Sequence, residues 1–327
     1  MKNWTRSGKS KLLIVFIILI IFLVLLSLNF NIGELPIEKT GQNISVFMCI
    51  NTTCEDRLTE FIMQANNTLD CALYELKSEK VIKALNTSLA RIRLVIDHDE
   101  INARNNFSFV RPSTNSALMH NKFCVSDGKK LLTGSYNPTN NIGDDNNMLV
   151  IESEGLAGNY ETEFSELWGD TKNLKNKKTK FTIGNATVEN YFCPEDDCAQ
   201  HVSDAIKSAN KSIYFMTFSF THPEIATDIV LKHYLGLDIK GVFERSQKSN
   251  FSKYDLLKAQ GIDTRWDGNK GTMHHKVFII DNETVITGSF NPSKNADDRN
   301  DENLLIIHDK KIALIYIDEF ERVWSKT

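Results

Sequence analysis

The chain has 327 residues, of which 41% are hydrophobic and 24% are charged, and its formal net charge is −4. This composition belongs to a folded protein with room for about two domains, and it excludes a chain that is disordered throughout. The acidic balance also argues against a broad nucleic-acid-binding face, although it is compatible with a local basic groove.

The N-terminal segment departs from this average. Residues 12–28 are almost entirely apolar, which is long enough for a helix that crosses a bilayer. Four basic residues precede this run, namely Lys2, Arg6, Lys9 and Lys11. The positive-inside tendency then predicts a cytoplasmic tail over residues 1–11, a transmembrane signal anchor over residues 12–30 and an extracytoplasmic remainder. A cleaved signal peptide is the alternative, but no small-any-small cleavage site follows the run.

The cysteines are compatible with export. Two pairs are each five positions apart: Cys49 with Cys54, and Cys193 with Cys198. In an oxidising compartment each pair is expected to close a small disulfide loop. A metal site is the alternative, but neither pair shows the Cys-any-any-Cys spacing of a zinc site. Cys71 and Cys124 lie in apolar, strand-like runs and are expected to be simply buried, with a bridge between them as the alternative.

Acceptor triplets for N-glycosylation, Asn-any-Ser/Thr, also follow the apolar run. Their asparagines are Asn43, Asn51, Asn66, Asn86, Asn106, Asn185, Asn210, Asn250 and Asn282. An Asn-rich chain contains some such triplets by accident, so they support an exported glycoprotein without proving one.

Beyond a linker over residues 31–44, the chain is duplicated. Helix, strand, helix and strand are predicted in the same order twice: over residues 56–66, 68–76, 78–88 and 91–97, and over residues 199–210, 211–220, 223–235 and 237–244. Each half closes with a helix that ends at a tryptophan, Trp168 or Trp324. Strands that alternate with helices predict an α/β fold, so we expect two tandem repeats over residues 45–170 and 187–327.

The segment between the halves, residues 171–186, is expected to be a linker. Five of its residues are lysines: Lys172, Lys175, Lys177, Lys178 and Lys180. We interpret them as a solvated charge run, with contact to phosphate or lipid headgroups as the alternative.

One motif occurs once in each half. Residues 120–137 read HNKFCVSDGKKLLTGSYN and residues 274–291 read HHKVFIIDNETVITGSFN. Both contain His, one residue, Lys, four residues, Asp, six residues, and then Gly-Ser-any-Asn. A single copy could be a surface accident followed by turn residues, but two copies at identical spacing argue strongly for a functional site.

The residue types of the motif suit phosphate chemistry. A His and a Lys separated by one residue on a strand point to the same side and combine a titratable imidazole with a fixed cation. The lysine and the asparagine can bind phosphate oxygens, and the imidazole can attack phosphorus or protonate the leaving oxygen. In-line displacement needs one group on each side of phosphorus, so two copies that face each other would complete one site.

These paired stretches resemble the phospholipase D superfamily, whose hallmark is this pattern in two copies. The resemblance covers the chain from about residue 45 to residue 327 and is closest to the compact, nuclease-type members. It implies a mixed β-sheet between α-helices in each repeat and two motifs that meet at the interface. It also implies a covalent phosphohistidine intermediate, with no metal and no cofactor, because lysine takes the role of the cation.

The resemblance carries the family's functional residues over by position. The catalytic set comprises His120, Lys122, Asn137, His274, Lys276 and Asn291. Ser135 and Ser289 match serines near the phosphate. Asp127 and Asp281 complete the motif and are expected to be structural, whereas His275 is expected to be a bystander.

The two repeats differ after the motif. The second repeat has Glu302 where the family often carries a glutamate that orients the catalytic imidazole, and the first repeat has Asn146 instead. We expect Glu302 to stand behind His274 and Asn146 behind His120. Because a carboxylate stabilises an imidazolium better than an amide does, the two histidines should differ in pKa and in role.

The motif leaves the alcohol groups of the substrate open. The anchor and the acidic remainder favour a phospholipid hydrolase or transphosphatidylase, whereas compact size favours a nuclease that acts on DNA or RNA. A non-catalytic phosphate-binding module is the third hypothesis, although both copies keep His, Lys, Ser and Asn. The expected partners are therefore a phospholipid headgroup or a nucleic-acid phosphodiester, together with the membrane through the N-terminal helix.

Overall fold

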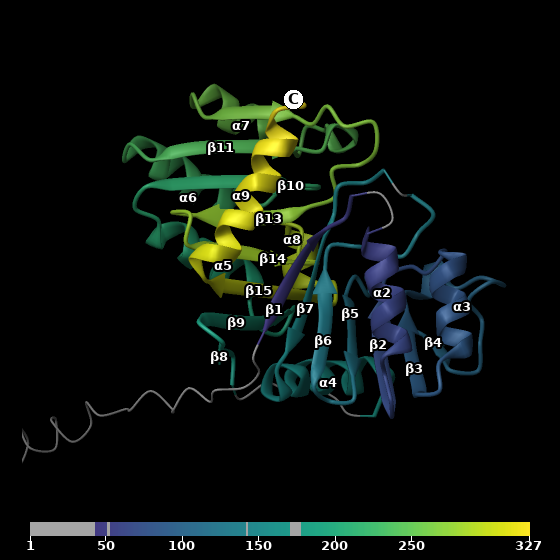
Figure 1. Cartoon of the computed structure of the whole chain (residues 1–327). Coiled ribbons are helices and arrows are strands. Elements are labelled where there is room, and N and C mark those ends of the chain that lie inside the picture. Colours follow the sequence, from purple (N-terminus) through teal and green to yellow (C-terminus); the bar gives the residue numbers. More distant parts are fainter. Residues whose placement is uncertain (1–42, 51–52, 142, 171–177) are drawn as a thin grey trace, which may run out of the picture. The chain divides into compact units, whose positions relative to one another are not determined.

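The computed structural model describes residues 43–50, 53–141, 143–170 and 178–327 (Figure 1). The tail and the anchor expected over residues 1–30 lie outside the described residues, as does nearly all of the linker expected over 31–44. Among the helices that are described, none combines the length and the apolar character needed to cross a membrane.

The first repeat forms one mixed sheet. Its elements in chain order are β1 (Ile44–Met48), α2 (Thr53–Met63), β2 (Thr68–Leu73), α3 (Glu79–Thr87), β3 (Arg91–Ile96), the short 3-10 helix η1 (His98–Glu100), β4 (Val110–Pro112), β5 (Lys122–Ser126), β6 (Lys130–Gly134), β7 (Asn147–Glu152) and α4 (Glu154–Trp168). The described strands are ordered β1-β7-β6-β5-β2-β3-β4. Strands β2, β3 and β4 run parallel, and the other neighbours pair antiparallel.

The second repeat has the same plan with one more strand. Its elements are β8 (Lys180–Ile183), β9 (Ala186–Cys193), α5 (Cys198–Ser208), β10 (Ser212–Thr217), α6 (Pro223–Tyr234), β11 (Asp238–Phe243), η2 (Arg245–Gln247), α7 (Tyr254–Ala259), β12 (Asp263–Trp266), β13 (Lys276–Ile280), β14 (Thr284–Gly288), α8 (Lys294–Asp298), β15 (Glu302–His308) and α9 (Lys310–Trp324). The described strands are ordered β12-β11-β10-β13-β14-β15-β9-β8. Part of the stretch expected as a linker, Lys180–Ile183, is therefore a strand, because it pairs with β9.

Local sequence sets the ends of the helices. The Ser78 hydroxyl accepts a hydrogen bond from the Val81 N–H at the start of α3, and the Ser153 hydroxyl does the same for Leu156 at the start of α4. Helix α4 ends where Gly169 adopts a φ of 87°, which glycine tolerates best. The same capping logic places Asp309 at the start of α9.

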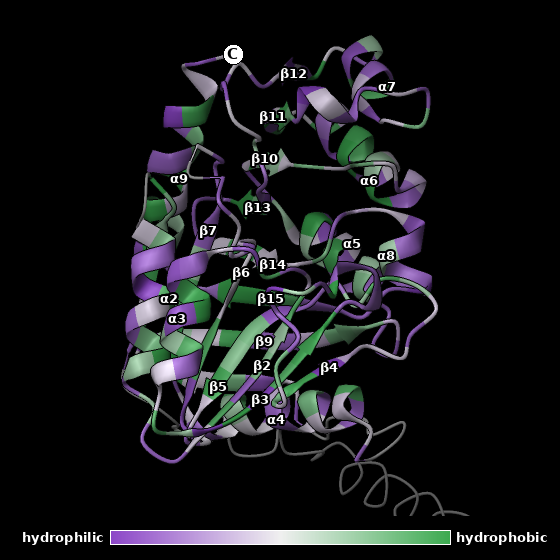
Figure 2. Ribbon diagram, turned by 90° about the vertical axis from the view of Figure 1, so that its right-hand side faces the viewer, coloured by the Kyte–Doolittle hydropathy of each residue, from purple (hydrophilic) through white to green (hydrophobic). Residues whose placement is uncertain are grey.

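Helices cover both faces of each sheet. In the first repeat, α2 and α3 pack on one face and α4 packs on the other. In the second repeat, α5 and α6 pack on one face and α9 packs on the other. Figure 2 shows the hydrophobic residues along β2, β3 and β5 that these helices cover. The mixed sheets between helices expected from the resemblance are thus present in both repeats.

The two repeats share a core. The cluster that contains α4 and α9 joins buried side chains from both sheets. Tyr160 of α4 contacts Phe123 of its own sheet and Phe192 of the other, with ring centroids 4.9 Å apart in each case. Burying this apolar surface holds the repeats together and fixes how their motifs meet.

All six cysteines form disulfides. Cys49–Cys54 and Cys193–Cys198 close the two small loops that their spacing predicts. Cys71 and Cys124 form a third disulfide, so the expectation that they are simply buried thiols is wrong. The reason is the sheet register, because β2 and β5 pair antiparallel with these two residues directly opposite each other.

Candidate active site

The two motifs lie at corresponding ends of the two sheets. Strand β5 begins at Lys122, opposite Leu73 at the end of β2, and β13 begins at Lys276, opposite Thr217 at the end of β10. Each histidine therefore lies just before its strand, at the seam between the repeats. Two short bridges cross this seam, one from Met119 to Asp301 and one from Asp145 to Met273.

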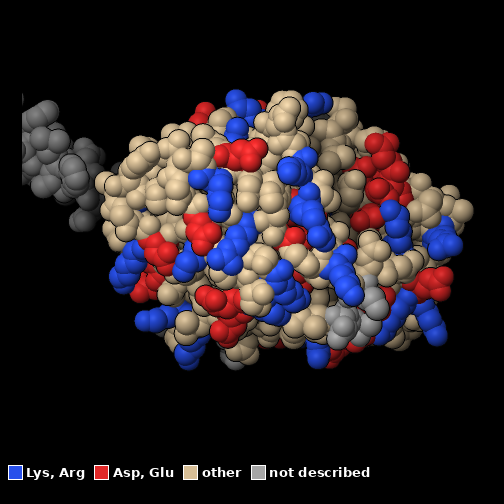
Figure 3. All heavy atoms as spheres, turned by 90° about the horizontal axis from the view of Figure 1, so that it is seen from above, with Lys and Arg blue, Asp and Glu red and all other residues tan. Residues whose placement is uncertain are grey.

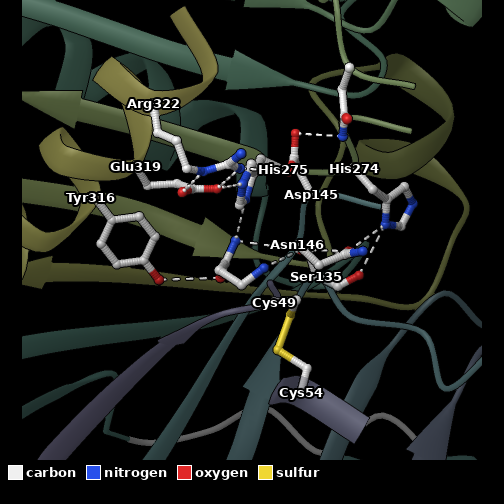
Figure 4. Close-up of polar contacts among 12 residues, drawn as sticks. Cys49, Cys54, Ser135, Asp145, Asn146, His274, His275, Tyr316, Glu319 and Arg322 are labelled. Atoms are coloured by element: carbon white, nitrogen blue, oxygen red, sulfur yellow. Dashed lines mark hydrogen bonds and ion pairs between the residues drawn. A yellow bond between two sulfur atoms is a disulfide. The ribbon is translucent and has the colours of Figure 1, made fainter. Parts of the chain in front are cut away.

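Each imidazole takes its hydrogen-bond partner from the opposite repeat. Nδ1 of His120 lies 2.7 Å from Oε2 of Glu302. Nδ1 of His274 lies 2.9 Å from Oδ1 of Asn146 and 3.1 Å from the backbone oxygen of Ser135 (Figure 4). The expectation that Glu302 stands behind His274 and Asn146 behind His120 is therefore wrong. One bridge places the residue before His120 beside the start of β15, and the other places the residue before His274 beside the chain that leads into β7. Each histidine therefore faces the partner residue of the other repeat.

The serines of the motif support these partners. The Ser135 hydroxyl donates to Oδ1 of Asn146 at 3.0 Å, and the Ser289 hydroxyl donates to Oε2 of Glu302 at 2.6 Å. Each hydroxyl oxygen also accepts a backbone N–H, from Asn147 or Asn303, at 3.0 Å. With these bonds the serines orient the groups that orient the histidines.

The motif lysines are buried beside aromatic rings. Nζ of Lys122 donates to the His120 carbonyl at 2.7 Å, and Nζ of Lys276 donates to the His274 carbonyl at 2.9 Å. These ammonium groups lie 5.1 Å from the Tyr74 ring centroid and 5.0 Å from the Phe218 ring centroid. The same two rings pack edge-on against His120 and His274, with centroids 5.2 and 4.8 Å apart.

Burial perturbs the titration of these groups. It lowers the pKa of His120 to about 4, an effect that Glu302 opposes and Lys122 reinforces. Burial also lowers the pKa of His274 well below its ordinary value, and Lys276 and Lys122 lower it further. The pKa of Lys122 falls to about 7 for the same reason, and that of Lys276 is also lowered. Basic groups held out of water in this way favour an anion between them, such as a phosphate.

A pocket of about 240 Å³ opens beside His274. Its lining includes Glu75, Asn137, Asp144 and Phe218. The side-chain oxygens of Asn137 and of its counterpart Asn291 are buried and have no hydrogen-bond partner among the described residues. Asn137 lines the pocket, and a polar atom left without a partner beside a pocket is typical of a binding site.

The motif aspartates hold a turn. The carboxylate of Asp127 accepts the backbone N–H groups of Asn66, Asn67 and Thr68 at 2.7–3.0 Å. Burial alone would raise the pKa of Asp127, but these donors outweigh it and lower the pKa to about 2. Asp281 accepts the equivalent three groups, from Asn210, Lys211 and Ser212. Neither aspartate lines the pocket beside His274.

Two acidic residues near the histidines escaped the sequence analysis. Asp97 Oδ2 accepts the backbone N–H of Met119 at 2.8 Å, and Glu244 Oε2 accepts that of Met273 at 2.7 Å. Each carboxylate thus holds the backbone just before a motif histidine. Asp97 follows β3 and Glu244 follows the equivalent strand β11, so aligning the repeats beyond the motif is the signal that finds them.

A network around His275 joins the two repeats (Figure 4). This fully buried side chain lies between Nδ2 of Asn147, at 3.1 Å, and Oε1 of Glu319, at 2.9 Å. Arg322 donates hydrogen bonds to Glu319 in its own helix and to Asp145 across the seam. His275 is fully buried and both of its ring nitrogens have partners in this network, so its place is structural.

The described residues contain no group of three or more His, Cys, Asp or Glu side chains arranged to hold a metal ion. Asp97, His98, Asp99 and Glu100, which resemble a metal cluster in sequence, instead form the cap and body of η1.

Comparison with known proteins agrees with this geometry. A family model described as "Cardiolipin synthase, PLD-like domain" matches residues 58–168 and 202–324. The chain belongs to the phospholipase D superfamily. As a member of this superfamily it is a hydrolase of the phosphodiesterase type, and the two matched segments correspond to its two repeats.

Curated superfamily members are similar to about one repeat of the chain. A phospholipase D from Rickettsia prowazekii is 33% identical over 162 residues, which cover 45% of this chain and 78% of the relative. A human mitochondrial cardiolipin hydrolase is 34% identical over 123 residues, which cover 37% of this chain and 49% of the relative.

A solved structure matches both repeats of this phospholipase D superfamily member. The phosphatidylserine synthase of Haemophilus influenzae covers 90% of this chain, and this chain covers 89% of it, with a TM-score of 0.68 and 13% identity. At that identity the similarity concerns the fold.

Proposed function

We propose that this phospholipase D superfamily member hydrolyses or transfers a phosphodiester bond of a membrane phospholipid through a phosphohistidine intermediate. The observation that carries the proposal is the pocket beside His274, which has Glu75 and Asp144 in its walls together with the Phe218 ring. Carboxylates and an aromatic ring suit a neutral or cationic leaving alcohol, such as a lipid headgroup. The same carboxylates repel the successive phosphates of a nucleic acid.

Charges beside the pocket and over one face of the protein support this choice. Nζ of Lys77, a cation next to the pocket wall, lies 2.6 Å from Glu75 and 2.9 Å from Glu100, so one cation is shared by two carboxylates and the net charge of this group is negative. On the face seen in Figure 3, lysine and arginine side chains are interspersed with aspartate and glutamate side chains. A nucleic-acid-binding groove needs instead a continuous basic track along the backbone of its ligand.

The proposed setting is the outer side of a membrane, with residues 12–30 as the anchor. The three disulfides support an oxidising compartment. Surface exposure of most acceptor asparagines supports glycosylation, namely at Asn43, Asn66, Asn86, Asn106, Asn185, Asn210 and Asn250. An anchored enzyme of this kind would meet phospholipids at the surface that holds it.

The test compares substrates under one condition. Purified full-length protein in detergent micelles receives phosphatidylcholine, cardiolipin and single-stranded DNA in parallel, with EDTA present. We expect release of a lipid headgroup alcohol and intact DNA. Cleavage of DNA without lipid turnover would replace the proposal with the nuclease alternative.

A variant pair separates catalysis from contamination. Lys122→Met with Lys276→Met removes the two phosphate-binding cations and is expected to lower the turnover rate by about 10²–10³-fold or more. The matched control is Lys129→Met, because Lys129 is exposed and pairs loosely with Glu154 at 3.7 Å. The control should keep full activity.

A further inference from the structure

The two active-site imidazoles differ in one hydrogen-bond partner. Nδ1 of His120 faces a carboxylate oxygen of Glu302, whereas Nδ1 of His274 faces the amide oxygen of Asn146 and a backbone oxygen. The supporting hydroxyls, from Ser289 and Ser135, bond the two partners in the same way. The surroundings therefore match in geometry and differ in the charge of one group.

The partners of His274 favour a neutral imidazole with a defined tautomer. Both groups that face Nδ1 are carbonyl-type acceptors, so Nδ1 carries the hydrogen and donates it. Nε2 then holds a lone pair. The charged neighbours of His274 are Lys276, Lys122 and His120, and each lowers its pKa in addition to burial. A neutral imidazole with a free lone pair is suited to attack phosphorus and unsuited to donate a proton.

The partner of His120 favours the protonated imidazole, and it opposes the burial that lowers the pKa of His120 to about 4. The Glu302 side chain is fully buried and accepts hydrogen bonds from Ser289, at 2.6 Å, and from Asn300, at 3.2 Å. Burial acts to raise the pKa of Glu302, but His120 and Lys122 outweigh it and keep the carboxylate ionised. An ionised carboxylate 2.7 Å from Nδ1 stabilises the imidazolium that a proton donor needs.

We propose that His274 is the nucleophile and that His120 is the general acid and then the general base. This assignment rests on the phosphohistidine mechanism of the proposed function. Asn146 and Glu302 act as positioning residues, because each works through the imidazole that it faces.

The reaction proceeds by two displacements at phosphorus. Nε2 of His274 attacks phosphorus, the bond from phosphorus to the leaving oxygen breaks, and that oxygen takes the proton from Nε2 of His120. This leaves phosphorylated His274, a free alcohol and a neutral His120. His120 then accepts a proton from water while the water oxygen attacks phosphorus. The P–N bond breaks, its electron pair returns to Nε2 of His274, and the starting state is restored.

The first experiment maps the phosphorylated residue in the full-length protein. The probe is bis(p-nitrophenyl) phosphate, whose leaving group needs little protonation, so the phosphoenzyme forms quickly and can be quenched in alkali for mass spectrometry. We expect the phosphoryl group on His274 in the wild-type protein. Phosphorylation of His120, or of neither residue, would overturn the assignment, and the wild-type measurement does not depend on whether any variant folds.

Variants provide a second readout. His120→Ala should still become phosphorylated at His274 and should accumulate the phosphoenzyme, because the base for the second step is missing. His274→Ala should not be phosphorylated at all. The reverse pattern would assign the roles the other way round.

Glu302→Gln tests the positioning role, because it gives His120 an amide partner like that of His274. We expect a rate loss of about 10²-fold or more for substrates with an alkyl alcohol leaving group and a smaller loss for the p-nitrophenyl ester. An equal loss for both substrates would contradict the acid role of His120. The p-nitrophenyl ester contains no lipid, so failure of the lipid proposal is measured separately from failure of this assignment.

Discussion

At the scale of single residues, the seam places two equivalent aspartates in unequal surroundings. Asp145 and Asp301 precede Asn146 and Glu302, and the backbone oxygen of each accepts the N–H of a motif histidine from the other repeat. The Asp145 carboxylate bonds Arg322 at 2.5 Å and Asn269 at 2.8 Å. The Asp301 carboxylate accepts a hydrogen bond from the amide of Asn115 at 2.9 Å. One aspartate thus has a cation beside it and the other has a neutral donor.

This difference predicts a pH effect on stability. Burial raises the pKa of Asp301 to about 7, and the neighbouring carboxylates of Glu195 and Glu302 act in the same direction. Because the folded pKa lies above the ordinary value, the folded protein favours the protonated acid, and its stability falls as pH rises from about 4 to about 7. Asp301→Asn should remove this loss and raise the free energy of unfolding at pH 8 by about 1–2 kcal/mol after allowance for solvent screening.

The measurement is urea unfolding at pH 4.5 and pH 8. The gain for Asp301→Asn should appear at pH 8 and nearly vanish at pH 4.5. Asp145→Asn is the matched control, and it should lose stability at pH 8 because Arg322 loses a charged partner. An equal change in stability for the two variants at pH 8 would contradict the difference between the surroundings of Asp145 and Asp301.

At the scale of elements, the disulfides have different tasks. The two small loops lie beside the groups that face the imidazoles: the Cys49 N–H donates to the Asn146 carbonyl at 2.9 Å, and Cys193 pairs with Glu302 between β9 and β15. Cys71–Cys124 instead joins two central strands, β2 and β5, of one sheet. Its residues are 53 positions apart, whereas those of each small loop are five apart.

The longer loop predicts the larger contribution to stability. Cys71→Ala with Cys124→Ala should lower the free energy of unfolding by about 4 kcal/mol, and Cys193→Ala with Cys198→Ala by about 2 kcal/mol, on the chain-entropy account of disulfides. Denaturant unfolding of both double variants under oxidising conditions checks the order. Equal losses would mean that restriction of the unfolded chain is not the main effect.

At the scale of the whole molecule, the active site exists where the repeats meet. Neither repeat contains both an imidazole and its partner, because the contacts of His120 and His274 cross the seam. The seam is held by the shared core and by the network of Arg322, Glu319 and Asp145. In the first repeat, Glu166 takes the place that Arg322 has in the second, so this network is present once.

Removal of the Arg322 cation should therefore affect stability and activity together. Arg322→Met leaves the buried carboxylates of Glu319 and Asp145 without their guanidinium and should cost about 3 kcal/mol of unfolding free energy. Activity should also fall, because Arg322 bonds the Asp145 side chain and the Asp145 backbone oxygen accepts the His274 N–H at 2.8 Å. The control is Arg57→Met, which breaks an exposed pair with Glu60 and should cost about 0.5 kcal/mol or less. Unfolding curves and turnover rates are measured on both variants, and similar losses would contradict the role of the seam network.

The sequence by itself determined what depends on local pattern. The duplicated motif, the α/β order of each repeat and the two short disulfide loops could all be predicted, because each rests on residues that are close together in the chain. The resemblance based on the motif also led to the correct superfamily.

Only the tertiary structure decided which distant residues meet. Cys71 pairs with Cys124 because β2 and β5 are neighbours, and linear order does not specify that adjacency. Glu302 faces His120, and Asn146 faces His274, because the shared core brings the repeats together with their motifs exchanged. Spacing within a repeat suggests that a residue lies beside the motif of the same repeat. Packing between repeats depends on whole surfaces, and here it reverses the expected pairing of Glu302 and Asn146 with the two histidines.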